Sequence, residues 1–572
     1  MNEKNESNTA YAVENETAMR PPPPSTRISA HTILAVLAVN VIYFAQLVNL
    51  VGAGAQAQTI AAALGEPNNT VWILGPITIM TVTFGPIVSQ AADFWGRRWF
   101  LIILTVMGGI GCLIVALAQS MGMLIAGFTI LGTAYGTQPL LHAVTSEVLP
   151  RRWRGVGQAT NMISNSLGSA VALIGGSLMN RSNDPTSDGF RHFYYMTMAF
   201  FFFGAVLCFF TYHPALREKQ SLPLSEKLAS LDWVGYALLS IGLALFCMAL
   251  SWSDNPYRWS NPHVCATFAV SVTALLGIAV YETWIRKDGM FHHRLFTHSG
   301  NKNFAICILC VFTEGAAFFA VNSHLAFQIT ILYETDGLIV GVRYTIAFIT
   351  ASLGAYFAGW YVARYKHARW ITVVAFGIFV VFFVLMATST RNTSLAVWFY
   401  PILMGWALGM TLTTLVTIAQ ISTPPDLIAI ATGLMLSFRA VGGAIGLTCY
   451  HALFNAQLHH LGDNIAKEAI PAGLEPQNLG HLIGAINDHN KTDLGSIPGI
   501  TPTIIKRSMA AFLDTFMSGF RSVWIAGGCF VALTTIISFF LVDRAEDYDM
   551  HVDAPIDAEP QQSSEQDKKA VV

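Results

Sequence analysis

Glu314 is the residue whose type and position could most directly carry out chemistry. It lies in the run Val311-Phe-Thr-Glu-Gly-Ala, inside an apolar segment at 303–332. Ionisable groups within hydrocarbon are costly and are candidates for function by default. A carboxyl group there can take up and release a proton, so we predict that Glu314 couples proton movement to function. A packing hydrogen bond or a paired charge would also account for its position.

Polar residues at helical spacing accompany Glu314 and recur on other apolar segments. At 100° per residue, Gln328 falls about 40° from Glu314 around the helix. Asn322 and His324 flank Glu314 at about 80° on either side, so one face of this segment is polar. With similar stripes elsewhere, this face predicts a cavity that binds an uncharged, oxygen-rich solute, and interhelical hydrogen bonding is the alternative. The predicted cavity residues are Asn40, Tyr43, Gln46, Gln138, His142, Asn161, Asn165, Asn322, His324, Gln328 and Arg439.

Four other charged residues lie in or beside apolar segments. Arg343 and Arg439 have apolar neighbours in the sequence. Each could bind a substrate anion, or pair with a carboxylate or a helix C-terminus. Glu147 and Glu282 lie at the ends of segments, where we expect structural or gating ion pairs.

No cofactor and no metal site are expected. Cys307 and Cys310 form a CxxC spacing, but inside an apolar helix this spacing is more typical of packing than of metal or redox chemistry. The histidines between residues 455 and 520 lack the close spacing of metal ligands. The chain has no G-x-x-x-x-G-K-[ST] motif for a nucleotide, and no nucleophile–base pair stands out. An enzyme is therefore not expected.

Composition indicates which elements must position these residues. Hydrophobic residues make up 53% of the 572 residues and charged residues 12%, and the mean hydropathy is +0.50. So little charge would leave large apolar patches on a soluble protein, which predicts an all-α membrane protein in contact with lipid. The formal net charge of −2 offers no basic surface for nucleic acid. Fourteen segments are suited to crossing a bilayer, at approximately 31–52, 70–92, 98–118, 121–145, 155–180, 194–212, 232–252, 263–282, 303–332, 338–362, 370–390, 396–421, 427–455 and 521–541.

The distribution of lysine and arginine predicts the orientation. Loops that face the cytosol when the N-terminus is cytosolic hold most of these residues, so both termini are expected in the cytosol. The polar ends, 1–30 and 543–572, are expected to be disordered. The stretch 455–520 is expected to be a long extracytosolic loop, with short amphipathic helices on the membrane face around 465–486. Sequons that would face outward on this topology, as in a glycoprotein, are at Asn68, Asn180, Asn392 and Asn490.

The loop between the second and third segments carries a motif. It reads S-Q-A-A-D-F-W-G-R-R over residues 89–98. Asp93 ends one helix, and Gly96 permits a tight turn. Arg97 and Arg98 favour the cytosolic face. The pattern resembles the cytosolic signature loop G-x-x-x-D-R-x-G-R-R of the major facilitator superfamily, with serine and phenylalanine in place of its first glycine and first arginine.

Other motifs narrow the resemblance. The stretch 231–235, L-D-W-V-G, resembles the l-D-w-x-G of the fourteen-span drug:proton antiporter group. Residues 252–264 resemble the corresponding segment of fungal trichothecene-efflux pumps and siderophore transporters, and 439–446 resemble the r-x-l-G-G-x-i-G of that branch. Two family motifs are weak. Phe128 stands in place of an arginine in the fourth segment, and only the final two glycines of G-P-x-x-G-G remain in the fifth.

The resemblance, which covers about 30–545, implies a major facilitator fold. This fold would have two six-helix bundles, at 31–212 and 303–541, and two inserted helices at 232–282. It implies a proton-coupled secondary transporter that exports a small organic secondary metabolite, toxin or drug. Siderophore-iron import is the alternative, and a non-transporting solute receptor is a third reading. The expected partners are the solute, protons and lipid, for a monomer in the plasma membrane.

Overall fold

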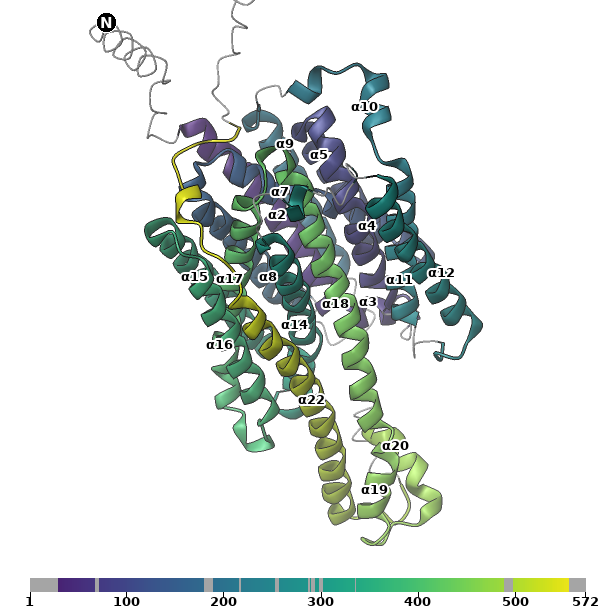
Figure 1. Ribbon diagram of the computed structural model, residues 1–572. Helices are drawn as coiled ribbons and strands as arrows, with labels where there is room; N and C mark the ends of the chain where they lie inside the picture. Colours follow the sequence, from purple (N-terminus) through teal and green to yellow (C-terminus); the bar gives the residue numbers. More distant parts are fainter. Residues whose placement is uncertain are drawn as a thin grey trace, which may run out of the picture.

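The computed structural model describes residues 29–66, 71–179, 189–214, 218–252, 257–286, 289, 294–297, 302–334, 336–487 and 497–554. Every regular element within these residues is helical, as expected, and Figure 1 shows the long helices side by side. The long helices are α2 (Ala30–Ala55), α4 (Val71–Trp95), α5 (Arg97–Ala116), α6 (Met121–Thr133), α7 (Gln138–Glu147), α8 (Arg154–Met179), α9 (Gly189–Thr211), α11 (Trp233–Trp252), α12 (Pro262–Val280), α14 (Asn303–Leu332), α15 (Gly337–Tyr365), α16 (Arg369–Ala387), α17 (Tyr400–Ile421), α18 (Ile428–Leu458) and α22 (Pro502–Ser538). Shorter helices are α3 (Ala57–Ala63), α10 (Leu224–Ser230), α13 (Arg294–Thr297), α19 (Leu461–Ala469) and α20 (Leu479–Asn487).

Among the described residues, 13 helices are long and apolar enough to span a membrane on their own. The fourth of the fourteen expected segments is not one of them, because it consists of two shorter helices in series, α6 and α7. Between α6 and α7, Ala134–Thr137 form a 3-10 turn. Pro139 lies in the first turn of α7 and has no amide proton for the preceding turn. From α2, Gln46 donates 2.9 Å hydrogen bonds to the Ala134 carbonyl and the Thr137 hydroxyl. A neighbouring helix thus satisfies the broken backbone, as the membrane interior requires.

The helices form two six-helix bundles with two inserted helices. The first bundle contains α2 and the helices from α4 to α9, and the second contains the helices from α14 to α18 together with α22. Helices α11 and α12 pack against each other, and α11 also packs on α4. The bundles meet chiefly where α8 packs on α15 and α4 on α18. The expected fold class is therefore confirmed.

The last membrane helix begins earlier than hydropathy indicates. Helix α22 starts at Pro502 instead of near residue 521, and Thr501 caps it by accepting a hydrogen bond from the Ile504 amide. Its first turns carry charged residues, which hide this part of the helix from a search for apolar runs. In Figure 1, α18 and α22 project together well beyond the other helices. The projecting part of α22 is therefore folded as helix, although it belongs to the expected loop.

The amphipathic helices expected on the membrane face pack instead at the tip of this projection. Buried residues of α19, including Leu461 and Ile465, face the protein, and α19 packs on α22. Asn464 donates a 3.1 Å hydrogen bond to the Thr515 hydroxyl. The apolar face of α19 therefore has a protein partner, and lipid is not needed to cover it.

Part of the C-terminal stretch expected to be disordered is ordered. Residues 543–554 lie against the bundle, with Asp543 at the N-terminus of α16, where its carboxylate accepts the Ala368 and Arg369 amides at 2.8 and 2.9 Å. Free amides at a helix start bind a carboxylate well, which explains the order. Residues 1–28 and 555–572 lie outside the described residues, as do the sequons at Asn68, Asn180 and Asn490.

Helices α14 and α18 approach each other unusually closely through two glycines. A Cβ atom on Gly315 would lie 2.0 Å from the Arg439 carbonyl oxygen, and one on Gly442 would lie 2.0 Å from the Phe312 carbonyl oxygen. No side chain fits in that space. The glycines therefore set the distance between these two helices, and with it the distance between the side chains that they carry.

Substituting Gly315→Ala should destabilise the protein by about 1–3 kcal/mol, because the added methyl group forces the two backbones apart. Thermal unfolding of the purified protein in detergent measures this effect. Gly377→Ala is the matched control, since a Cβ atom there meets nothing within 4 Å. Equal melting temperatures for the two variants would contradict the role of Gly315.

Candidate functional site

The centre of the candidate site is an ion pair between Glu314 on α14 and Arg439 on α18. Arg439 Nε donates to Glu314 Oε2 at 2.5 Å, and a terminal guanidinium nitrogen donates to Oε1 at 3.0 Å. The Glu314 side chain is fully enclosed, whereas that of Arg439 is 18% exposed. The guanidinium also lies over the Phe318 ring, 4.9 Å from its centroid. The paired charge that the sequence left open for each of these residues is the pair that they form with each other, and Arg439 is the partner that keeps some exposure.

Polar residues of the first bundle lie opposite this pair. The Tyr43 ring on α2 meets the His142 ring on α7 edge to face, with centroids 5.3 Å apart. Asn165 on α8 donates a 3.2 Å hydrogen bond to the Tyr43 hydroxyl. Helix α7, which carries His142, packs on α18, which carries Arg439. Asn161 lies beside His142, with 3.4 Å between its amide nitrogen and His142 Nδ1.

We call Tyr43, His142, Asn161, Asn165, Glu314 and Arg439 the central cluster. It draws on five helices from both bundles. The His142 ring is buried, and its Nε2 atom has no hydrogen-bond partner within the described part of the chain. Buried polar atoms without partners are rare in folded proteins. The cluster therefore offers an unused hydrogen-bonding atom on one bundle and a partly open cation on the other.

A second polar network joins the two bundles. The side-chain oxygen of Gln158 on α8 accepts from His142 Nδ1 at 2.6 Å, and its amide nitrogen donates to the Ser146 hydroxyl at 2.6 Å. Ser146 also donates to the Gln420 side chain of α17, and Gln158 does so at 3.2 Å. Gln420 in turn donates to the Thr432 hydroxyl at 3.0 Å. We call Ser146, Gln158, Gln420 and Thr432 the gate network, and it connects the central cluster to contacts between the bundles.

Sequence reasoning did not select the gate residues. Gln158 lies three positions before Asn161 and continues the polar stripe on its helix, so the spacing could have indicated it. Gln420 lies just before the Thr423-Pro424 break. A polar residue at a segment end does not stand out, because segment ends are usually polar.

Three of the predicted cavity residues hold helices together. Asn40 donates to the Thr160 hydroxyl at 3.1 Å and accepts from Ser164 at 2.9 Å, which joins α2 to α8. Gln46 satisfies the break in the fourth segment. Gln328 donates to Ser389 at 3.0 Å and accepts a 2.7 Å hydrogen bond from the Trp524 indole.

Of the three remaining predicted cavity residues, two lie apart from the central cluster. Asn322 accepts a 3.0 Å hydrogen bond from the Tyr344 hydroxyl. His324 Nδ1 lies 3.1 Å from the Ala320 carbonyl, among the rings of α18. Gln138 is partly exposed at the start of α7, one turn before His142 of the central cluster, so it stays a predicted lining residue. The polar face of α14 therefore divides among several contacts, and only Glu314 joins the central cluster.

The loop motif forms an ion-pair network at one end of the bundles. Gly96 has φ of 88°, which L residues rarely adopt, and it caps α5. Arg97 pairs with Asp93 at 3.1 Å and with Glu147 at the end of α7, all three side chains being buried. Arg98 donates to the Phe209 carbonyl at 2.8 Å. We call the end that carries this motif the signature-loop end, and the expected ion pair of Glu147 is present there.

Arg343 is the other arginine singled out in the sequence, and its contacts lie far from the signature-loop end. Its guanidinium is 3.8 Å from Glu334 and stacks over the Trp398 ring at 4.4 Å. It therefore pairs with a carboxylate, which was one of the alternatives for it.

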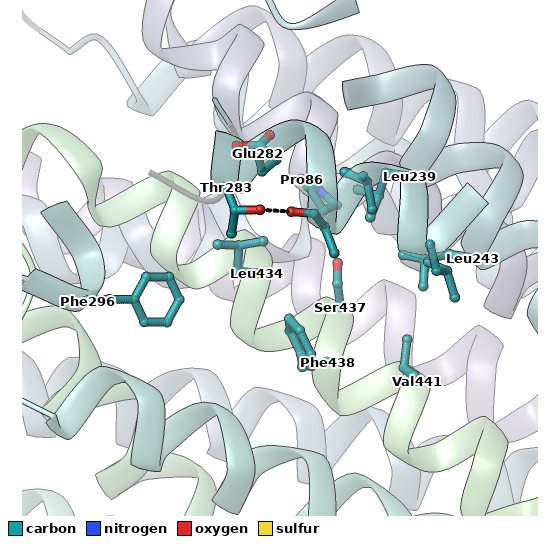
Figure 2. Close-up of a pocket in the computed structure, with 13 residues that line it drawn as sticks. Pro86, Leu239, Leu243, Glu282, Thr283, Phe296, Leu434, Ser437, Phe438 and Val441 are labelled. Atoms are coloured by element: carbon teal, nitrogen blue, oxygen red, sulfur yellow. Dashed lines mark hydrogen bonds between the residues drawn. The ribbon is translucent and has the colours of Figure 1, made fainter. Parts of the chain in front are cut away.

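A separate, apolar cavity lies where the inserted helices meet the bundles. Its volume is about 610 Å³, and it is lined by Pro86 of α4, Leu243 of α11, Ile278 of α12 and Phe438 of α18, among others. Figure 2 shows Phe438 and Ser437 facing it from α18. The turn of α18 that carries Arg439 thus also forms one wall of this cavity.

Comparisons with known proteins agree with this architecture. The sequence profile of the Major Facilitator Superfamily matches residues 36–447. The chain is 26% identical to the MFS-type efflux transporter pyiT of Pyricularia grisea, over 73% of this chain and 71% of the relative. It is 24% identical to the MFS-type efflux transporter ffsH of Aspergillus flavipes, over 81% and 79%, and 22% identical to the efflux pump FUS6 of Gibberella moniliformis, over 93% and 91%.

Solved structures of transporters share the fold. The proton:xylose symporter XylE superposes with a TM-score of 0.55 at 13% identity, covering 92% of this chain and 98% of XylE. An inward-facing bacterial homologue of the human lysosomal transporter Spinster gives a TM-score of 0.53, covering 89% and 98%. With the matched profile and the two bundles around a polar centre, the chain belongs to the Major Facilitator Superfamily.

Proposed function

We propose that this protein is a proton-coupled secondary transporter that exports a small organic metabolite, and that the central cluster is its coupling site. The observation that carries this proposal is the ion pair of the enclosed Glu314 with Arg439, on the second bundle where α18 packs on α7 of the first. Relatives named as efflux transporters and efflux pumps support export. Their names favour export over the siderophore import that the sequence left open.

The ion pair can couple protons to solute because only one partner at a time neutralises Glu314. In the present arrangement Arg439 holds the carboxylate through two hydrogen bonds. Proton uptake by Glu314 would release the guanidinium, which already borders open space. The solute binds the guanidinium through an acceptor oxygen while Glu314 is still ionised and holds it in place, and protonation of Glu314 then releases the solute. Proton and solute thus occupy the site in alternate states, so each transport cycle moves a proton against the solute.

Amides and one imidazole of the first bundle would complete the solute site. Asn161, Asn165 and the free Nε2 of His142 face the central cluster from α7 and α8. These groups hydrogen-bond neutral oxygen-rich molecules without adding charge. Tyr43 supplies an aromatic face and a hydroxyl. The solute class that fits is a neutral or weakly acidic molecule with several carbonyl or hydroxyl groups.

Alternating access would follow from the gate network. Its hydrogen bonds between Ser146, Gln158 and Gln420 hold the bundles together near the signature-loop end. Rocking of the bundles around the central cluster must break these bonds to open that end. Following the lysine and arginine bias, we place this end and both termini in the cytosol of a plasma-membrane protein that acts as a monomer in lipid.

A comparison of metabolites tests the function itself. Untargeted mass spectrometry of cells and medium, from a strain lacking this protein and from its parent, should reveal an oxygen-rich metabolite retained in the deletion cells. Complementation with the intact chain should restore its release. A ferric chelate left unconsumed in the medium of the deletion strain, with no retained metabolite, would reverse the proposed direction.

Glu314→Gln should abolish proton coupling, because the amide cannot exchange its partner for a proton. In proteoliposomes that contain a pH-sensitive dye, the metabolite identified above should drive proton flux through the parent protein. The variant should give only the flux of protein-free vesicles, while it still binds the metabolite.

Glu334→Gln is the matched control for this experiment. This substitution also removes a carboxylate that pairs with an arginine. The Glu334 carboxylate lies 3.8 Å from the Arg343 guanidinium, however, and this pair is outside the central cluster. Its proton flux should stay near that of the parent. Unimpaired flux in Glu314→Gln would exclude Glu314 as the coupling group.

A further inference from the structure

The segment after α22 crosses the signature-loop end and touches both bundles. In Figure 1 it is the yellow chain that leaves α22 and runs along the bundle toward α9. On the second bundle, Asn303 exchanges two hydrogen bonds with the backbone of Val542, at 2.8 and 2.9 Å. The adjacent Asp543 caps α16. This side of the segment is thus fixed to the bundle from which it emerges.

The other side of the segment is bound by the backbone of the first bundle. The Arg152 amide donates to the Asp549 carbonyl at 2.8 Å, and the Arg151 amide donates to the His551 carbonyl at 3.0 Å. The Ala554 amide donates to the carbonyl of Glu147 at 3.0 Å. Three backbone hydrogen bonds in six residues are a defined docking interaction, in a stretch whose composition predicts disorder.

One carboxylate concentrates the charge of this contact. Asp553 pairs with Arg154 and lies 2.9 Å from a terminal nitrogen of Arg151. The side chains of Asp553 and Arg154 are only 3% and 2% exposed. Charges that are this enclosed are strongly held only while both partners remain in place.

The same arginine belongs to the gate. Arg154 Nε donates to the Ser146 carbonyl at 3.0 Å, and its NH1 donates to the Gln420 carbonyl at 3.4 Å. Asp553 therefore orients an arginine that bridges the two bundles beside the gate network. Between the two anchored ends of the segment, the Tyr548 ring is buried, with 3% exposure.

We propose that residues 543–554 are a latch that holds the signature-loop end closed, and that this end opens only after Asp553 leaves Arg154. The second-bundle side is covalently continuous with α22, so separation of the bundles must break the contact on the first bundle. The latch is a regulatory element of the chain itself. It acts whichever solute is carried and in whichever direction.

The experiment measures the width of this end directly. Spin labels attached through H213C on the first bundle and R364C on the second report the distance across it by pulsed electron resonance. Both positions are exposed in the parent. The exposed cysteines Cys265, Cys449 and Cys529 are first replaced by serine. The full-length protein is studied in lipid nanodiscs without solute, so the result does not depend on the proposed transport activity.

The parent should show mainly the short distance. Asp553→Asn should raise the ratio of the open to the closed population by about tenfold, the size expected for losing hydrogen bonds between charged groups. Deletion of residues 549–572 should give the same shift, and this second variant leaves Arg154 and the helices unchanged. Deletion of residues 555–572 is the matched control and should keep the parent distribution.

An unchanged distance distribution in both Asp553→Asn and the 549–572 deletion would overturn the latch. A shift in the 555–572 deletion as large as in the longer deletion would overturn the assignment to residues 543–554. Failure of metabolite export with intact distance shifts would instead count against the proposed function alone.

Discussion

The rest of the structure depends on keeping a carboxylate and a guanidinium together in the apolar interior. An enclosed ion pair contributes little net stability, but removal of one partner costs about 3–5 kcal/mol, because the other is left buried and unpaired. Glu314 has no exposure at all, so its helix must hold Arg439 within hydrogen-bonding distance or supply a proton. Gly315 and Gly442 meet this requirement by letting α14 and α18 touch backbone to backbone. The packing of two helices is thus set by the electrostatics of one pair.

The central cluster, the gate network and the latch form one continuous set of contacts. His142 belongs to the central cluster and bonds with Gln158 of the gate network. Ser146 and Gln420 of the gate accept hydrogen bonds from Arg154 through their carbonyls, and Arg154 is held by Asp553. A change in charge at Glu314 can therefore reach the end of the bundles through Arg439, the packing of α18 on α7 and the gate network. Contiguity alone does not demonstrate coupling, which needs a two-state element that both sites bias. The bundles themselves are that element in our account.

Much of the fold could be predicted from sequence, because hydrocarbon imposes strict rules on composition and length. The apolar segments, the Asp93–Arg97 motif and the positive φ of Gly96 follow from local residue types. The break at Ala134–Thr137 was also present in the sequence as Pro139, although its satisfaction by Gln46 was not. Local rules therefore predict the elements better than they predict which distant side chains meet.

What the sequence could not indicate is which polar residues meet. Glu314 and Arg439 are 125 positions apart, and although the motif at 439–446 singles out Arg439, nothing in the sequence indicates that Glu314 is its partner. Polar stripes on helices predicted a lining, but Gln328 and Asn40 face neighbouring helices instead. The order of residues 543–554 depends on carbonyls and amides of distant loops, so a polar composition gave no sign of it. Likewise the charged first turns of α22 hid a helix that its neighbours support.

The account rests on the claim that Glu314 exchanges Arg439 for a proton. Infrared difference spectroscopy of the protein in lipid, recorded as the pH is lowered, detects the carbonyl stretch of a newly protonated carboxyl group. We predict a band that is lost in Glu314→Gln and kept in Glu334→Gln. The same difference spectrum in all three proteins would contradict the account, since Glu314 would then stay paired throughout.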